Sequence, residues 1–238
     1  MARPNSNRWL IIPALLLAVV AVACGGGEEK TLLNKYFMAS KVADNMTLAN
    51  IATVAFDPVA DGQMQTFSIM SVSAEKVAPL ELKAKAAELK AAVDDEKAFS
   101  VKMKAFQEAN LDAIDRILKA EGKNQTLKGK DAELQKEWTK WREEARVHSK
   151  KVSEIRKVVA GAQPIVEISC QDQRNPIDVQ AYEGEVASKD VTIEGRVKQE
   201  AGTATKKYLF TLQRVILKGV NGKDNVGRWV ITDRKNVQ

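Results

Sequence analysis

The sequence predicts an α+β protein in which N-terminal helices pack on a curved antiparallel sheet and a long antiparallel coiled-coil hairpin is inserted into that domain. Three observations predict this fold class. Residues 31–44 carry apolar side chains at helical spacing. Residues 77–162 are dense in Ala, Glu, Lys and Leu, which is the composition of helices. Residues 163–232 change to the alternation of apolar and polar side chains that is typical of strands.

The start of the chain has the pattern of a secretory signal peptide. Arg3 and Arg8 precede an apolar run at residues 9–23, which contains Pro13. This run is shorter than the roughly 20 residues that a membrane-spanning helix needs, so an uncleaved membrane helix is the weaker alternative. A charged start, a short apolar run and small residues at its end predict cleavage, so residues 1–23 are expected to be a signal peptide.

The apolar run ends on small residues that lead directly into a cysteine. The segment Ala21-Val22-Ala23-Cys24 resembles the lipobox of bacterial lipoproteins, with Ala21 where Leu is usual. The resemblance implies that Cys24 carries diacylglycerol and, in many bacteria, a further acyl chain such as palmitate. Two or more acyl chains anchor a protein stably. Gly25 follows in place of a retention Asp, which implies the periplasmic face of the outer membrane where one exists.

The charge balance of the remaining chain is mild. Without residues 1–23, 35 basic residues stand against 31 acidic ones, a net charge of +4. The charges are interspersed, and no basic block of the kind that binds nucleic acid is present in the sequence. We therefore expect the membrane, reached through the lipid anchor, and a protein partner or a second copy of the chain as partners, and no nucleic acid.

The elements after the anchor follow from spacing and turn residues. Residues 24–30 are expected to be the lipidated cysteine and a flexible tether, because three glycines follow Cys24. Residues 31–44 are predicted to be a helix with Thr31 as its N-cap, and Thr47 is predicted to cap a second short helix. Residues 64–72 are rich in strand formers and predict a strand.

Residues 75–162 are predicted to be the helical hairpin, with a polar loop at residues 122–129 between its arms. In the second arm, apolar residues alternate spacings of four and three, which is typical of a coiled-coil seam. These seam residues are Leu134, Trp138, Trp141, Ala145, His148, Val152, Ile155 and Val159. The first arm repeats the alternation from Phe99 to Ile117, but Leu82 to Val93 runs in a different phase, so we expect a bend or phase shift between Val93 and Phe99. Arms of about 30 residues would be about 45 Å long.

The C-terminal part is predicted to be a meander of antiparallel strands. The expected strands are residues 163–170, 179–187, 191–198, 207–218 and 228–232, with a turn at Asn221-Gly222. Cys170 lies in the first of these strands, where we expect it to be a small buried hydrophobe.

This order of elements resembles the NTF2-like, cystatin-related α+β cone. The residues that carry the resemblance are Tyr36-Phe37-Met38-Ala39 with Val42-Ala43-Asp44, and Tyr208-Leu209-Phe210-Thr211-Leu212 with Gly227-Arg228-Trp229-Val230-Ile231. The resemblance implies one cone domain made of residues 31–73 and 163–238. It also implies that residues 75–162 are an insertion, because the family has one modest helix at that place.

No residue pattern in the sequence indicates catalysis, a cofactor or a metal site. His148 is the only histidine, and it occupies a seam position without a metal-binding motif around it. The catalytic motifs of NTF2-like enzymes are absent, so no catalytic residue is expected. Trp138 and Trp141 share one helix face and are candidate partner-binding residues, because Trp is enriched in binding hot spots. The alternative interpretation is that both tryptophans pack inside the hairpin.

The sequence therefore favours a non-enzymatic, lipid-anchored protein of the cell envelope. We expect it to recruit a protein partner, or to self-associate, through the coiled-coil hairpin. One alternative is the binding of a small ligand or lipid in the cavity of the cone. A second alternative is a hydrolase or isomerase that works in the same cavity.

Overall fold

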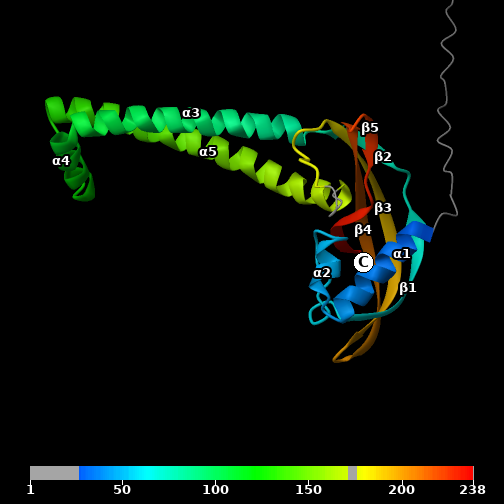
Figure 1. Cartoon of the computed structure of the whole chain (residues 1–238). Helices are drawn as coiled ribbons and strands as arrows, with labels where there is room; N and C mark the ends of the chain where they lie inside the picture. The colour runs from blue at the N-terminus through cyan, green and yellow to red at the C-terminus, as the bar shows by residue number, and fades with distance from the viewer. Residues whose placement is uncertain (1–26, 171–175, 238) are drawn as a thin grey trace, which may run out of the picture.

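The computed structural model describes residues 27–170 and 176–237. They form a curled antiparallel sheet, two helices packed against it, and a long helical arm that projects from one end of the sheet (Figure 1). The α+β class and the curved antiparallel sheet are therefore confirmed. The predicted signal peptide and the lipid site at Cys24 lie outside the described residues.

The sheet has six strands built around one long central hairpin. The strands are β1 (Gln63–Val72), β2 (Lys76–Leu80), β3 (Gly184–Gln199), β4 (Gly202–Val220), β5 (Lys223–Val226) and β6 (Val230–Val237). β3 and β4 pair along their whole length, β1 and β2 pair with successive parts of β3, and β5 and β6 pair with β4. Long paired strands twist strongly, which gives the sheet its curl.

The predicted turn at Asn221-Gly222 is confirmed. Both residues have positive φ angles, 50° and 79°, and they join β4 to β5 where Val220 pairs with Lys223. Two successive positive φ angles are the geometry of the tight hairpin turn that Asn-Gly favours.

The two strands predicted at residues 179–187 and 191–198 are wrong in detail, because β3 is a single strand. The polar residues 188–190 suggested a break between them. In the structure they stay paired with β4, and the side chains of Lys189 and Asp190 find partners on other elements. Asp190 accepts a hydrogen bond of 2.8 Å from the Thr211 hydroxyl, and Lys189 pairs with Glu29.

The core of the body lies between the sheet and helix α1 (Gly27–Lys41). Leu33, Tyr36 and Phe37 of α1 are buried against Phe210 and other apolar residues of β3, β4 and β6. The Tyr36 hydroxyl donates a hydrogen bond of 2.9 Å to the carbonyl of Val54, so the buried phenol is not left unpaired. The short helix α2 (Asn45–Ala49) follows, and Asp44 caps it rather than the predicted Thr47, by accepting a hydrogen bond from the Thr47 amide.

Helix α1 begins four residues before the predicted N-cap Thr31. Residues 27–30 therefore belong to the helix and not to the flexible tether predicted at residues 24–30. The reason is tertiary: Glu29 is buried, and its carboxylate pairs with the buried ammonium group of Lys189 on β3. A buried charge is stable only with such a partner, so this pair fixes the first turn of α1 on the sheet.

The arm consists of α3 (Leu82–Ala109), α4 (Leu111–Gly122) and α5 (Lys130–Cys170). α3 runs from the sheet to the tip and α5 returns beside it, while α4 folds back across the tip (Figure 1). At 1.5 Å per residue, α3 is about 42 Å long and α5 about 60 Å. The predicted polar loop at residues 122–129 connects α4 to α5.

The predicted phase shift between Val93 and Phe99 is wrong. Ala92 is buried and Val93 lies largely outside the interface, so the face of α3 that meets α5 runs from Leu89 through Ala92 and Glu96 to Phe99. The spacing of three and four is therefore uninterrupted, and α3 breaks only at Asn110. The sequence favours Val93 for the interface because it is the larger apolar residue. The interface instead takes the small side chain of Ala92.

Residues 163–170 are helical and not the predicted strand, and Pro164 lies inside α5. The β-branched residues of this segment favour strands on local grounds. Packing overrides that preference, because Val166 and Cys170 lie one helical turn apart and bury against Val215 and Leu217 of β4. The structure also adds β2 at the start of the predicted hairpin, where Lys76–Leu80 pairs with β3.

The end of α5 is joined to the sheet in the gap between β5 and β6. The Ser169 hydroxyl donates to the Arg228 carbonyl (2.8 Å) and accepts from the Val215 amide (2.9 Å). The Arg228 amide donates to the Ser169 carbonyl (2.9 Å), and its Nε donates to the Ile168 carbonyl (2.7 Å). These four bonds, which we call the arm root, satisfy the last carbonyls of α5 and fix the arm on the sheet.

The arm root generates a stability prediction. Ser169→Ala removes one donor and one acceptor, and it leaves the buried Val215 amide unpaired. We expect the free energy of unfolding to fall by about 2 kcal/mol, since an unsatisfied buried group costs about 1–3 kcal/mol. Urea unfolding followed by circular dichroism measures the change. Ser153→Ala, on the exposed face of the same helix, is the control, and equal unfolding midpoints for the two variants would contradict the role of Ser169.

Candidate functional site

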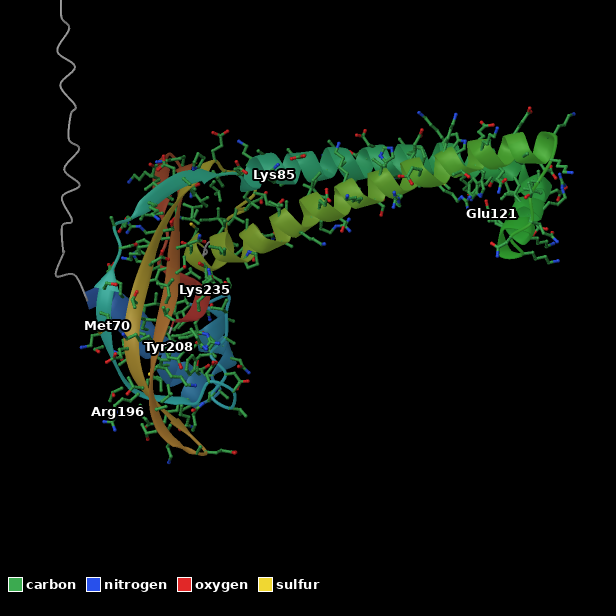
Figure 2. All side chains as sticks on the ribbon, turned by 180° about the vertical axis from the view of Figure 1, so that it is seen from behind. Met70, Lys85, Glu121, Arg196, Tyr208 and Lys235 are labelled. Atoms are coloured by element: carbon green, nitrogen blue, oxygen red, sulfur yellow. The ribbon has the colours of Figure 1, made fainter. Side chains whose placement is uncertain are left out.

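The space between α1 and the sheet is filled with aromatic side chains. Phe37 meets Phe56, Phe67 and Phe210 with ring centroids 5.1 to 5.8 Å apart, and Tyr36 meets Phe210 edge to face at 5.9 Å. Tyr208 also points into this cluster and is fully buried (Figure 2). The ligand-binding and enzyme alternatives both need a cavity here, and this packing gives neither of them support.

A charged pair lies beside the rings of Phe56 and Tyr208 at the edge of this aromatic cluster. Nη1 of Arg234 lies 2.8 Å from Oδ2 of Asp61, and both side chains are largely buried. The Arg234 guanidinium also stacks 5.0 Å from the ring centre of Phe56. Burial raises the pKa of Tyr208, with a further rise from the Asp61 charge and an opposing effect of Arg234. Burial likewise raises the pKa of Tyr36 well above its usual value. Both phenols are protonated at neutral pH. The Asp61 carboxylate is paired with Arg234, which favours a structural role for this ion pair.

Metal and thiol chemistry receive no support from the geometry. Within residues 27–170 and 176–237, no group of three His, Cys, Asp or Glu side chains is placed to hold a metal ion. His148 lies in the interface of the arm, stacked on Phe99 with 4.8 Å between ring centroids. Burial raises the pKa of the Cys170 thiol to about 11, with a smaller opposing effect of its hydrogen bond with Ser169, so the thiol is not reactive at neutral pH.

No helix within residues 27–170 and 176–237 is both long enough and apolar enough to cross a membrane.

The candidate residues Trp138 and Trp141 lie near the tip of the arm. Trp138 is 5% exposed and packs with Ile114 and Ile117 of α4 in a small cluster that we call the tip core. Trp141 is half-buried, and its ring centroid lies 5.2 Å from that of Phe99 and 5.4 Å from that of Phe106. The structure therefore places Trp138 in the interior and leaves only part of Trp141 accessible.

Two bidentate ion pairs hold α4 against α5. Arg142 donates to both carboxylate oxygens of Glu121 at 2.8 and 2.9 Å, and Arg116 donates to both of Asp131 at 2.9 and 2.7 Å. Figure 2 shows Glu121 at the far end of the arm. Hydrogen bonds from Arg142, and then from Gln135, lower the pKa of Glu121. The hydrogen bond from Arg116 lowers the pKa of Asp131. Paired guanidinium and carboxylate groups of this geometry give orientation as well as stability.

The tip also exposes apolar side chains that the sequence analysis did not single out. On α4, Leu111 is 67% exposed and Leu118 is 47% exposed. They are seven residues apart, so they lie on the same side of the helix. The sequence offered no signal for them, because apolar residues of α4 are equally suited to the interior, and only the packing of α4 decides which ones face solvent.

Comparison with known protein families, with curated proteins and with solved structures found no match to this chain. The resemblance to the NTF2-like cone therefore stays a prediction that rests on the residues quoted for it.

The ion pairs of the tip generate a prediction about pH. Because the pKa of Glu121 is lower in the folded protein than its ordinary value of 4.5, the stabilisation by Arg142 is fully present above pH 4.5 and is lost as the pH falls through the folded pKa. We expect Arg142→Met to lower the free energy of unfolding at pH 7 by about 1 kcal/mol or less, since the pair is partly exposed.

The difference between Arg142→Met and the wild type should shrink between pH 5 and pH 3. Urea unfolding followed by tryptophan fluorescence measures it, because Trp138 lies beside the pair with the Arg142 guanidinium 5.7 Å from its ring centre. Arg156→Met, at an exposed position of α5, is the control. A difference that does not change with pH would contradict the assignment to Glu121.

Proposed function

We propose that this protein is a non-enzymatic, lipid-anchored protein of the cell envelope that presents a rigid helical arm to a protein partner. The single observation that carries the proposal is the arm itself. α3 and α5 extend far beyond the sheet and carry a separately packed tip with its own small core (Figure 1). Only the base of the arm packs against the sheet, and the outer part adds nothing to the core of the body, so the length of the arm is best explained by its reach toward a partner.

The packing of the arm supports a role in recruiting a protein partner, because the arm is fixed to the sheet and is not a loosely attached insertion. The arm root fixes α5 to the sheet. All eight predicted seam positions of α5 are buried or half-buried. This alternation of three and four is the reason for our proposal that α3 and α5 form an antiparallel coiled coil. A rigid support lowers the entropy cost of binding at its end.

The accessible side chains favour the tip as the contact surface. The seam of α5 is used within the arm, so self-association through it would require α3 and α5 to separate. Leu111 and Leu118 are exposed on α4, whose other face packs in the tip core, and they need no rearrangement to meet a partner. Trp138 then acts as a support for α4 and not as a contact residue.

The proposed lipid anchor at Cys24 would determine which part of the protein lies at the membrane and which part extends away from it. Because α1 begins at Gly27, only Gly25 and Gly26 separate its start from Cys24, and the three steps along the chain span at most about 11 Å. The body would stay at the membrane surface, and the arm would be the part able to reach another protein. The curled sheet wrapped on α1 is the observation that supports the NTF2-like proposal for the body.

The partner proposal is tested by photocrosslinking in intact cells. With a photoreactive amino acid at position 118, we expect a defined crosslinked product of the full-length protein. Adding Leu111→Glu to the protein with the photoreactive residue at position 118 should remove most of that product, because a charge at Leu111 opposes an apolar contact. Val147→Glu, a matched change at an exposed apolar position along the arm, should keep it. A crosslinking pattern that is the same in all variants would contradict recruitment through the tip.

The anchor is tested separately by mass spectrometry of the native protein. We expect an N-terminal peptide that begins at Cys24 and carries acyl chains, and Cys24→Ser should abolish the acylation and release most of the protein from the membrane. Cys170→Ser should leave both unchanged, because that thiol is buried at the arm root. An unmodified residue 24 in the wild-type protein would refute the lipoprotein proposal without affecting the tip proposal.

A further inference from the structure

A groove of about 600 Å³ lies between the first turns of α1 and the segment that joins β5 to β6. It is separate from the filled interior of the body and from the arm tip. Three basic side chains line it, Lys35, Arg214 and Arg228, together with the apolar side chains of Leu32, Ile51 and Trp229. The groove therefore combines basic side chains with an apolar floor.

The basic groups of this groove are largely free to bind an anion. Lys35 and Arg228 are exposed, and neither forms an ion pair with another described residue. Arg228 uses its Nε at the arm root, which leaves its two terminal nitrogens. The Arg214 guanidinium stacks 4.7 Å from the ring centre of Trp229, and one of its nitrogens contacts Glu75 at 3.1 Å. Glu28 is the one acidic side chain among the lining residues.

Two buried hydrogen-bond donors at the groove have no acceptor. Nε1 of Trp229 and Nε of Arg214 are inaccessible and unpaired within the described residues. Trp229 itself is only 9% exposed. Because neither atom reaches the surface of the groove, they do not contact a ligand directly, and their partial positive charges add to the positive potential of the groove floor. The buried ammonium group of Lys189, 3.9 Å from the ring centre of Trp229, adds positive charge beneath the floor, although its partner Glu29 largely offsets it.

We propose that this groove binds the phosphate group of an anionic phospholipid headgroup, an inference that rests on the proposed lipid anchor at Cys24. Phosphate is the anion that suits two planar guanidinium groups and an ammonium group. The anchor selects the source: Gly27 lines the groove and lies three residues from Cys24, so the groove would sit within about 11 Å of the anchor point. The apolar floor suits the glycerol and first acyl carbons beside the phosphate.

Headgroup binding at this place would also orient the arm. Arg228 lines the groove and also contributes to the arm root through its Nε and its amide. The same short segment therefore contacts the lipid and the end of α5. A phosphate held by Arg228 fixes the direction of the arm relative to the membrane.

The binding test uses the full-length protein in neutral detergent and reads the indole N–H signal of Trp229 by NMR, assigned with Trp229→Phe. The probe is dioleoylphosphatidylglycerol added to the micelles, with dioleoylphosphatidylcholine and sodium phosphate as separate arms. We expect a saturable shift with phosphatidylglycerol that the other two probes do not reproduce at the same concentration. The double variant Lys35→Gln, Arg228→Gln should weaken the apparent affinity at least tenfold.

The matched control is Lys30→Gln, Lys41→Gln, which removes two exposed charges of the same helix outside the groove and should change the affinity less than twofold. An equal shift with phosphatidylcholine would overturn anion recognition, and an equal shift with sodium phosphate would overturn the lipid source. No shift with any probe, or an equal loss in the control variant, would overturn the site. Repeating the titration with Cys24→Ser separates this inference from the anchor, because groove binding should persist without acylation.

Discussion

The hydrogen bonds of Ser169 are the constraint on which the rest of the structure depends. On the edge of β4 that faces away from β3, β5 and β6 pair with different parts of the strand and leave Arg214 and Val215 without a strand partner on that edge. The last turn of α5 fills this gap, with the Ser169 hydroxyl taking the place of a strand at the Val215 amide. Gly227 lies so close to Ser169 that a side chain at this position would collide with it. One helix end thereby completes the sheet and fixes the arm.

The body and the arm are stabilised by different kinds of packing. The body buries a contiguous aromatic and aliphatic core between α1 and the sheet, and one buried ion pair sets where α1 begins. The arm has no comparable core along its length. It depends on a narrow interface between two helices, a small cluster at the tip, a larger cluster shared with β4 at its base, and the bidentate ion pairs of the tip. A change in the arm is therefore expected to act locally, whereas a change at the arm root affects both parts.

This division supports a protein that contacts its partner through the arm tip and attaches to the membrane through the body. Leu111 and Leu118 are exposed on α4, which lies at the end of the arm away from the sheet (Figure 1). The cationic groove lies on the body, beside the start of α1 and so beside the proposed anchor. Arg228 belongs to both the groove and the arm root, which gives a physical route by which the membrane could set the direction of the arm. Neither proposed role needs a catalytic group.

The sequence by itself determined the α+β class, the helical character of residues 82–109 and 130–162, the loop at residues 122–129, β1 and the Asn221-Gly222 turn, because each depends on local spacing, composition or turn geometry. Only the tertiary structure decided the rest. Residues 163–170 became helical because one helical face could bury against β4, and Ala92 entered the interface because α3 and α5 are close there. Glu29 joined α1 because Lys189, far away in the sequence, neutralises it. The groove likewise combines α1 with the segment after β5, so no local pattern could have predicted it.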